Sequence, residues 1–192
     1  MPPLILASTS PYRRALLERL GVPFLALTPA CDEEALKTPG MPPERMALTL
    51  ARAKAASVAD THHGAVVIGS DQVCALDDEI LHKPGTQAKA IAQLERLSGR
   101  AHRLITAVSL RHGVWEETHV ETVTLRMRAL DHAALVRYAV ADDPVDCAGA
   151  YKLERRGIAL FERIEAADHD SIVGLPLLWL VGRLAKLGYP IP

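Results

Sequence analysis

Short apolar runs alternate along the chain with segments whose apolar residues recur at helical spacing. An apolar run at residues 4–7 precedes a helical pattern at 11–20, and a second run at 65–69 follows a helical pattern at 43–59. Short continuous runs are typical of buried strands, whereas apolar residues three and four positions apart share one helix face. Residues 102–127 alternate in a way that predicts antiparallel strands. We therefore expect a mixed α/β (α+β) fold.

The same reading places the remaining elements. Helices are predicted near residues 87–97, 131–140 and 175–187, and strands near 24–27, 147–151 and 157–164. The stretch from 28 to 43 is predicted to be a loop, because it is rich in proline and carries Asp32, Glu33 and Glu34. A loop of that length is often functional. The apolar face of the closing helix is either core or a homodimer contact.

Composition narrows the class of protein. With 192 residues, 49% of them apolar, we expect a single domain over 1–192, built as two closely packed lobes. A net charge of -1 argues against a nucleic-acid partner. No apolar stretch approaches the roughly 20 residues of a membrane span, so no membrane partner is expected. Three scattered cysteines indicate neither a disulfide framework nor a zinc site, and predict a cytoplasmic protein.

Hydroxyl and basic side chains surround the start of the first predicted helix. Ser8 and Ser10 follow the first apolar run, Pro11 takes the first helical position, and Arg13 lies close behind. Ser10 is typical of an N-cap, and the missing N–H of Pro11 costs nothing there. Free backbone amides, hydroxyls and a guanidinium at a helix N-terminus suit a phosphate group. The same residues are equally typical of an ordinary capped helix, so both interpretations stay open.

A predicted hairpin brings a carboxylate and an ammonium together. Asp71 follows the second buried run, where we expect the strand to end, and Asp77 with Asp78 can form a two-residue hairpin turn. That register sets Gln72 opposite Lys83 and puts the ammonium beside Asp71. The carboxylate could hold a divalent ion or deprotonate water, while the lysine neutralises phosphate oxygens. The alternative is a surface ion pair, which contributes only about 0–1 kcal/mol.

A series of short motifs runs in order along nearly the whole chain, and together they resemble the Maf family of nucleoside triphosphate pyrophosphatases. The motifs are Leu-Ala-Ser-x-Ser-Pro-x-Arg-Arg at residues 6–14, Asp32-Glu33, Lys54, Ser70-Asp71-Gln72-Val73, Lys83-Pro84, Leu97-Ser98-Gly99, Ala148-Gly149 and Val173-Gly174-Leu175-Pro176. Residues 71–74 and 147–152, with Thr9, Tyr12 and Glu154, are similar to the branch that acts on 7-methyl-GTP. One departure is Ala53, where the family often has glutamate before the helix lysine.

The resemblance implies a fold and a reaction. The fold is the Maf/ITPase-like one, with a central mixed, twisted sheet, helices around it and a substrate cleft between two lobes. The reaction is hydrolysis of a nucleoside triphosphate between its α and β phosphates, with a divalent metal cation (Mg, Mn or Co) as cofactor.

Site roles also follow from the resemblance. Ser8, Ser10, Arg13 and Lys54 are expected to bind the triphosphate, although a lysine on an amphipathic helix is usually only a solvated side chain. Asp71, Glu33 and Lys83 are expected to be catalytic, with Asp71 as proton acceptor and with Glu33 and Asp71 facing the metal.

Base selection is assigned to three positions. The Watson-Crick edge of guanine offers two adjacent donors, which a carboxylate such as Glu154 can accept, and a methylated, cationic base suits the aromatic face of Tyr12. The resemblance adds Gln72 to this set. Each residue also has an ordinary interpretation: Tyr12 can cover the helix surface, Gln72 can complete a strand ladder, and Glu154 can pair with a neighbouring arginine.

Three functions follow from this reading. The first is a metal-dependent pyrophosphatase for 7-methyl-GTP, or a Maf-type pyrophosphatase that prefers dTTP or UTP. The second is a non-catalytic nucleotide-binding regulator of cell division. The third is a phosphotransferase, which the missing Gly-x-x-x-x-Gly-Lys-Ser/Thr loop disfavours.

Overall fold

The computed structural model describes residues 1–191, which form two compact units. Unit 1 comprises Met1–Gln72, Thr106–Glu121 and the chain from Asp168 onward, and unit 2 comprises Val73–Ile105 and Thr122–Ala167. The expected close packing of two lobes stays a prediction. None of the described helices is long and apolar enough to cross a membrane.

The elements follow one another in the order β1 (Leu4–Ala7), α1 (Pro11–Glu18), β2 (Leu25–Leu27), α2 (Glu33–Leu36), α3 (Pro43–Ala59), β3 (Val66–Leu76), β4 (Glu79–Leu81), α4 (Gln87–Leu97), β5 (Ala101–His112), β6 (Trp115–Met127), α5 (His132–Asp142), the 3-10 helix η1 (Arg156–Leu160), β7 (Phe161–Glu165), α6 (Asp170–Val173) and α7 (Leu177–Lys186).

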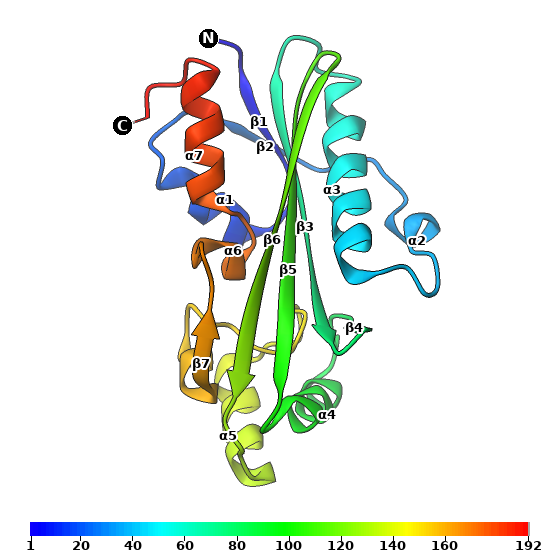
Figure 1. The fold of residues 1–192 in the computed structure, drawn as a ribbon, viewed down its shortest axis with the longest axis vertical. Coiled ribbons are helices and arrows are strands. Elements are labelled where there is room, and N and C mark those ends of the chain that lie inside the picture. Colours follow the sequence, from blue (N-terminus) through cyan, green and yellow to red (C-terminus); the bar gives the residue numbers. More distant parts are fainter. Residues whose placement is uncertain (192) are drawn as a thin grey trace. The chain divides into compact units, whose positions relative to one another are not determined.

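Within the described residues the strands form one mixed sheet of seven (Figure 1). Its order is β2-β1-β3-β5-β6-β7, and β4 pairs with β3 off this path. β1 runs parallel to β2 and β3, whereas β4 is antiparallel to β3 and β7 is antiparallel to β6. A turn at Gly113 and Val114 joins β5 to β6, and so short a connection requires antiparallel neighbours. The predicted mixed α/β fold with an antiparallel portion is confirmed.

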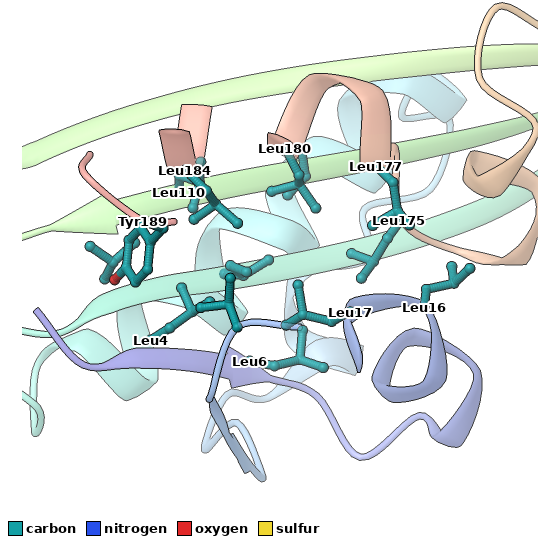
Figure 2. Packing of buried hydrophobic residues seen from close by; sticks show 14 residues of the cluster. Leu4, Leu6, Leu16, Leu17, Leu110, Leu175, Leu177, Leu180, Leu184 and Tyr189 are labelled. Carbon is teal, nitrogen blue, oxygen red and sulfur yellow. The ribbon is translucent and has the colours of Figure 1, made fainter. Parts of the chain in front are cut away.

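Strand β1 in unit 1 is apolar because helices cover both of its faces. Successive side chains on a strand point to opposite faces. Leu4 and Leu6 belong to a buried cluster with Leu17 of α1 and with Leu180 and Leu184 of α7 (Figure 2). Helix α7 therefore contributes to the core, which is one of the two roles predicted for it.

Helix α3 covers the other face of β1 in unit 1 (Figure 1). Ile5 and Ala7 pack there with Ala55 and Val58 of α3. Gly69 of β3 allows a close approach at this face, since a Cβ atom on it would lie 2.2 Å from the carbonyl oxygen of Ala51. The absence of a side chain at Gly69 therefore lets α3 lie directly against the sheet.

Unit 2 contains α4 packed against α5 and a buried aromatic cluster. The Nε2 atom of His102 lies 2.9 Å from the hydroxyl of Tyr151. The ring of Phe161 meets that of Tyr151 edge to face, with centroids 4.8 Å apart. Burial lowers the pKa of His102 to about 4, so this imidazole is neutral at pH 7.

Two of the predicted strands were wrong in whole or in part. Residues 147–151 form no strand, because Gly149 and Ala150 take φ angles of 81° and 60°, in the left-handed region that interrupts a strand. The predicted strand at 157–164 begins instead as the helix η1, and the extended backbone starts only at Phe161.

The predicted loop at 28–43 contains a short helix, α2. The carboxylate of Asp32 caps it by accepting a hydrogen bond from the Ala35 amide at 3.1 Å. An aspartate at the N-cap with glutamates in the first turn is a helix-start signal that the loop prediction overlooked. The helix matters for the site because Glu33 is its first residue.

Candidate active site

The start of α1 has the predicted architecture. Ser10 is the N-cap, with its side chain accepting from the Arg13 amide at 3.4 Å, and Pro11 is the first helical residue. Ser8 is buried just after β1, and its hydroxyl oxygen accepts from the Ser10 amide at 3.1 Å. Tyr12 is half-buried on the same helix. The capped helix is therefore present, and its exposed N-terminal turn keeps the electrostatic preference for an anion.

A buried lysine joins two carboxylates from separate elements of unit 1. The Nζ atom of Lys54 on α3 lies 2.6 Å from Oδ1 of Asp71 on β3 and 3.1 Å from Oε2 of Glu33 on α2. The side chains of Lys54 and Asp71 are only 9% and 11% exposed. The interpretation of Lys54 as a solvated helix side chain is therefore wrong. Helical spacing placed Lys54 on the predicted helix but could not show that its side chain contacts Asp71 and Glu33.

Strand β3 separates its polar side chains by face. Gly69 and Asp71 face α3, whereas Ser70 and Gln72 point to the other side, where they reach the α6 segment. The strand does not end at the second apolar run but continues through Asp71 to Leu76, where the predicted hairpin turn begins. The ladder continues because each polar residue at 70–72 finds partners on its own face, so no buried polar group is left unpaired there.

The guanidinium of Arg13 belongs to the same cluster of charges. Its Nε donates to the carbonyl of Gly174 at 3.0 Å. Burial lowers the pKa of Arg13, and the negative charges of Asp71 and Glu33 oppose that shift. Arg13 and Lys54 thus both act electrostatically on the carboxylates of Asp71 and Glu33.

Cys31 is a neighbour of this cluster that the sequence did not single out. Burial raises the pKa of its thiol, Glu33 raises it further, and Lys54 lowers it. The thiol therefore stays protonated at neutral pH and is a poor nucleophile there.

Gln72 makes contacts that its predicted role in base selection did not anticipate. Its Nε2 atom lies 2.8 Å from Oγ1 of Thr106, 2.9 Å from the carbonyl of Ser171 and 3.0 Å from the carbonyl of Ile172. Three oxygens around one atom identify it as the amide nitrogen, whose two N–H groups are used inside unit 1. Thr106 and Ser171 were missed by the sequence reasoning; Ser171 lies just before the motif at 173–176, which was the available signal.

The remaining predicted site residues lie in unit 2. The hairpin after β3 has the predicted turn, because Leu76 pairs with Glu79 on either side of Asp77 and Asp78. Lys83 is exposed just beyond β4, and Glu154 is exposed in the turn before η1. The positions of Lys83 beside Asp71 and of Glu154 in a base pocket stay predictions.

Comparison with known proteins shows which family the chain resembles in sequence. The sequence model described as Maf-like protein matches residues 3–187. The chain belongs to the Maf family. The resemblance found in the sequence motifs is therefore confirmed.

Curated relatives match this Maf protein over nearly their whole length. A protein of Cupriavidus metallidurans is 47% identical over 98% of this chain and 95% of its own. One from Bordetella pertussis is 48% identical over 97% and 93%, and one from Pseudomonas syringae pv. tomato is 43% identical over all of both chains. All three are named 7-methyl-GTP pyrophosphatase.

A solved structure shares the fold at low sequence identity. The HAM1 protein from Coxiella burnetii aligns with 97% of this Maf chain and all of its own, with a TM-score of 0.53 and 14% identity. That likeness supports the predicted fold class and carries no statement about function.

Proposed function

We propose that this Maf protein hydrolyses 7-methyl-GTP to 7-methyl-GMP and pyrophosphate. The full-length relatives named for that activity support the choice of substrate. The observation that carries the choice of reaction is the buried Lys54, held between Asp71 and Glu33 with Arg13 close by. Paired acids and bases of this kind suit phosphoryl chemistry, where positioning and charge neutralisation supply most of the catalysis.

Positive and polar groups of the site are assigned to the triphosphate. The hydroxyls of Ser8 and Ser10 and the free amides of α1 donate hydrogen bonds to phosphate oxygens at the helix N-terminus. Arg13 keeps its Nη groups for a phosphate, because the hydrogen bond to Gly174 uses only Nε. Lys54 exchanges a carboxylate for a phosphate oxygen when the substrate enters, and Lys83 is assigned as a further positive charge.

Negative groups of the site are assigned to a divalent metal and to water. Asp71 and Glu33 supply two hard oxygen donors that already converge on one cation, the ammonium of Lys54. Among residues 1–191 no cluster of three or more His, Cys, Asp or Glu side chains suits a metal ion. Mg²⁺ is often bound by one or two carboxylates together with substrate phosphates and water, so this small donor set fits it.

Proton transfer is assigned to Asp71. An aspartate with an ordinary pKa near 4 is a weak base, so the attacking water would need the lowered pKa, about 7 in favourable sites, that a divalent ion held by Asp71 and Glu33 would give it. Asp71 would then accept the proton of the attacking water, while the carboxylate of Glu33 would help to hold the metal ion. Burial of Asp71 beside Lys54 and near Arg13 keeps the carboxylate oriented for this step.

Base preference is assigned to Glu154, Tyr12 and Gln72. Glu154 accepts the two adjacent donors of guanine, and Tyr12 offers its ring to the cationic methylated base. The N–H groups of Gln72 are bonded within unit 1, so we assign its contact with the base to its side-chain carbonyl oxygen.

A substrate panel tests the proposal. Purified protein is assayed with Mg²⁺, Mn²⁺ or Co²⁺ against 7-methyl-GTP, GTP, dTTP and UTP, and both pyrophosphate and orthophosphate are measured. We expect 7-methyl-GTP to give the highest kcat/KM, with pyrophosphate as the released product. Faster turnover of dTTP or UTP would assign the protein to another substrate branch. Nucleotide binding without turnover on any substrate would make it a regulator instead.

The variant Glu154→Gln tests the base assignment. A neutral amide cannot accept two bonds at full strength, so we expect discrimination between guanine and pyrimidine triphosphates to fall by about 1–3 kcal/mol. The ratio of kcat/KM values for 7-methyl-GTP and UTP measures it. An unchanged ratio removes Glu154 from the base pocket.

A further inference from the structure

Three strand side chains in unit 1 hold the backbone of the α6 segment. Gln72 of β3 donates to the carbonyls of Ser171 and Ile172, and the hydroxyl of Thr106 on β5 donates to the carbonyl of Ser171 at 2.7 Å. The hydroxyl of Ser70 on β3 lies 2.9 Å from the carbonyl of Gly174. Side chains from two neighbouring strands thus fix carbonyls at both ends of one short segment.

These hydrogen bonds lie in a largely buried environment. The side chains of Ser70 and Thr106 belong to residues that are 0% and 1% exposed, and Ser171 is also fully buried. Thr106 both accepts from Gln72 and donates to Ser171, so its hydroxyl is satisfied in both roles. Buried networks of this kind rigidify the backbone that they hold, because an unpaired polar group there is costly.

The segment held in this way orients Arg13. The carbonyl of Gly174 accepts from Nε of Arg13 at 3.0 Å and lies 2.9 Å from the hydroxyl of Ser70, whose single proton it shares with the carbonyl of Ala107, also at 2.9 Å. Gly174 has a φ of 124°, and a Cβ atom on it would lie 3.1 Å from Nε of Arg13. The backbone conformation therefore favours glycine, and a side chain at this position would push against the guanidinium of Arg13.

We propose that Ser70 and Thr106 are positioning residues that orient Arg13 toward the triphosphate by fixing the carbonyl of Gly174. The inference rests on the proposed function, which assigns Arg13 to the phosphates. With Nε anchored, the planar guanidinium has one remaining direction for its Nη groups, so a bidentate phosphate contact is prepared before substrate arrives. Neither Ser70 nor Thr106 needs to touch the substrate for this effect.

The test compares two ligands that differ in their dependence on Arg13. Inhibition constants of pyrophosphate and of 7-methyl-GMP are measured for wild type, Ser70→Ala, Thr106→Val and Thr106→Ser. We expect Ser70→Ala and Thr106→Val to weaken pyrophosphate about tenfold or more and 7-methyl-GMP less than about twofold, as fits loss of a charge-assisted hydrogen bond. Thr106→Ser keeps the hydroxyl and should stay near wild type.

A matched control separates positioning from general damage. Ser109→Ala removes another fully buried hydroxyl of β5, one that bonds to Glu116 rather than to α6. We expect it to leave both inhibition constants within about twofold of wild type. If Ser109→Ala raises the inhibition constant of pyrophosphate as much as Thr106→Val does, the proposal is overturned.

A double-mutant cycle with Arg13→Lys distinguishes the failures. In the Arg13→Lys background, Ser70→Ala and Thr106→Val should change pyrophosphate inhibition by less than about twofold, because the anchored guanidinium is already gone. Additive losses would overturn the positioning role while leaving Arg13 as a phosphate ligand. If Arg13→Lys alone has no effect on pyrophosphate or on KM, the role of Arg13 in the proposed function fails, and the positioning role fails with it. Should Thr106→Val not fold, Ser70→Ala decides the outcome.

Discussion

Replacing Lys54 by methionine probes the arrangement on which the site depends. The substitution keeps most of the length of the side chain and removes its charge, leaving Asp71 and Glu33 without the ammonium that lies 2.6 Å and 3.1 Å from them. Removing one partner of a buried ion pair costs about 3–5 kcal/mol, because the other charge is left uncompensated. The positive charge of Arg13 still acts on Asp71, so we expect the lower end, about 3 kcal/mol.

The assay is unfolding in urea and by heat. For a protein of this size a loss of 1 kcal/mol lowers Tm by about 2–4 °C, so Lys54→Met should lower it by about 6–12 °C. Lys37→Met is the matched control, since Lys37 pairs with the exposed Glu34 on α2, where a surface pair contributes about 0–1 kcal/mol.

The double variant Lys54→Met/Asp71→Leu should be more stable than Lys54→Met alone. It removes one positive and one negative charge, so the remaining Arg13 and Glu33 again balance, and stability should recover relative to Lys54→Met alone. If Lys54→Met lowers the free energy of unfolding by less than about 1 kcal/mol, as Lys37→Met does, the reasoning is refuted. Lys54 would then contribute no more to stability than a surface ion pair.

Further predictions concern Gly69, His102 and Cys74. Gly69→Ala should cost about 3 kcal/mol and reduce activity, because its Cβ would meet the Ala51 carbonyl at 2.2 Å, whereas Gly182→Ala, with open space around it, should be neutral or stabilising in thermal unfolding. The pKa of His102 falls from 6.5 to about 4 on folding, so its contribution is present above pH 6.5 and is lost as the pH falls toward 4, by on the order of 3 kcal/mol. Urea unfolding from pH 7 to pH 4 should show this slope in wild type and not in His102→Phe; equal slopes would contradict it. Burial raises the pKa of Cys74 to about 12, so iodoacetamide at pH 8 should label this thiol only after unfolding, and mass spectrometry of the native protein checks it.

Local sequence signals were sufficient to predict the helices that have clear capping residues or a regular apolar spacing. Helices α3 and α4 span the predicted residues, and Ser10 and Pro11 mark the start of α1 as expected. Each of these depends on caps or on apolar spacing within one segment of chain. The hairpin turn at Asp77 and Asp78 followed for the same reason, because two short polar residues at that position favour a tight turn.

Other features depend on contacts between distant segments. The contact of Asp71 with Lys54 spans 17 residues, and the contact of Gln72 with Thr106 spans 34. No local pattern contains such pairs. The failure at residues 147–151 has another cause, since the left-handed φ of Ala150 is unusual for a residue with a side chain and apolar composition alone favours a strand there.

The most direct test of the account is the turnover of 7-methyl-GTP by Asp71→Asn, measured as pyrophosphate release together with nucleotide binding. The amide keeps the size of the side chain and its place beside Lys54 but cannot accept a proton from water. We predict that kcat falls by about 10²–10⁴, the usual contribution of a general base, while the nucleotide still binds. Pyrophosphate release by Asp71→Asn within about twofold of wild type would contradict the central claim that this carboxylate performs the chemistry.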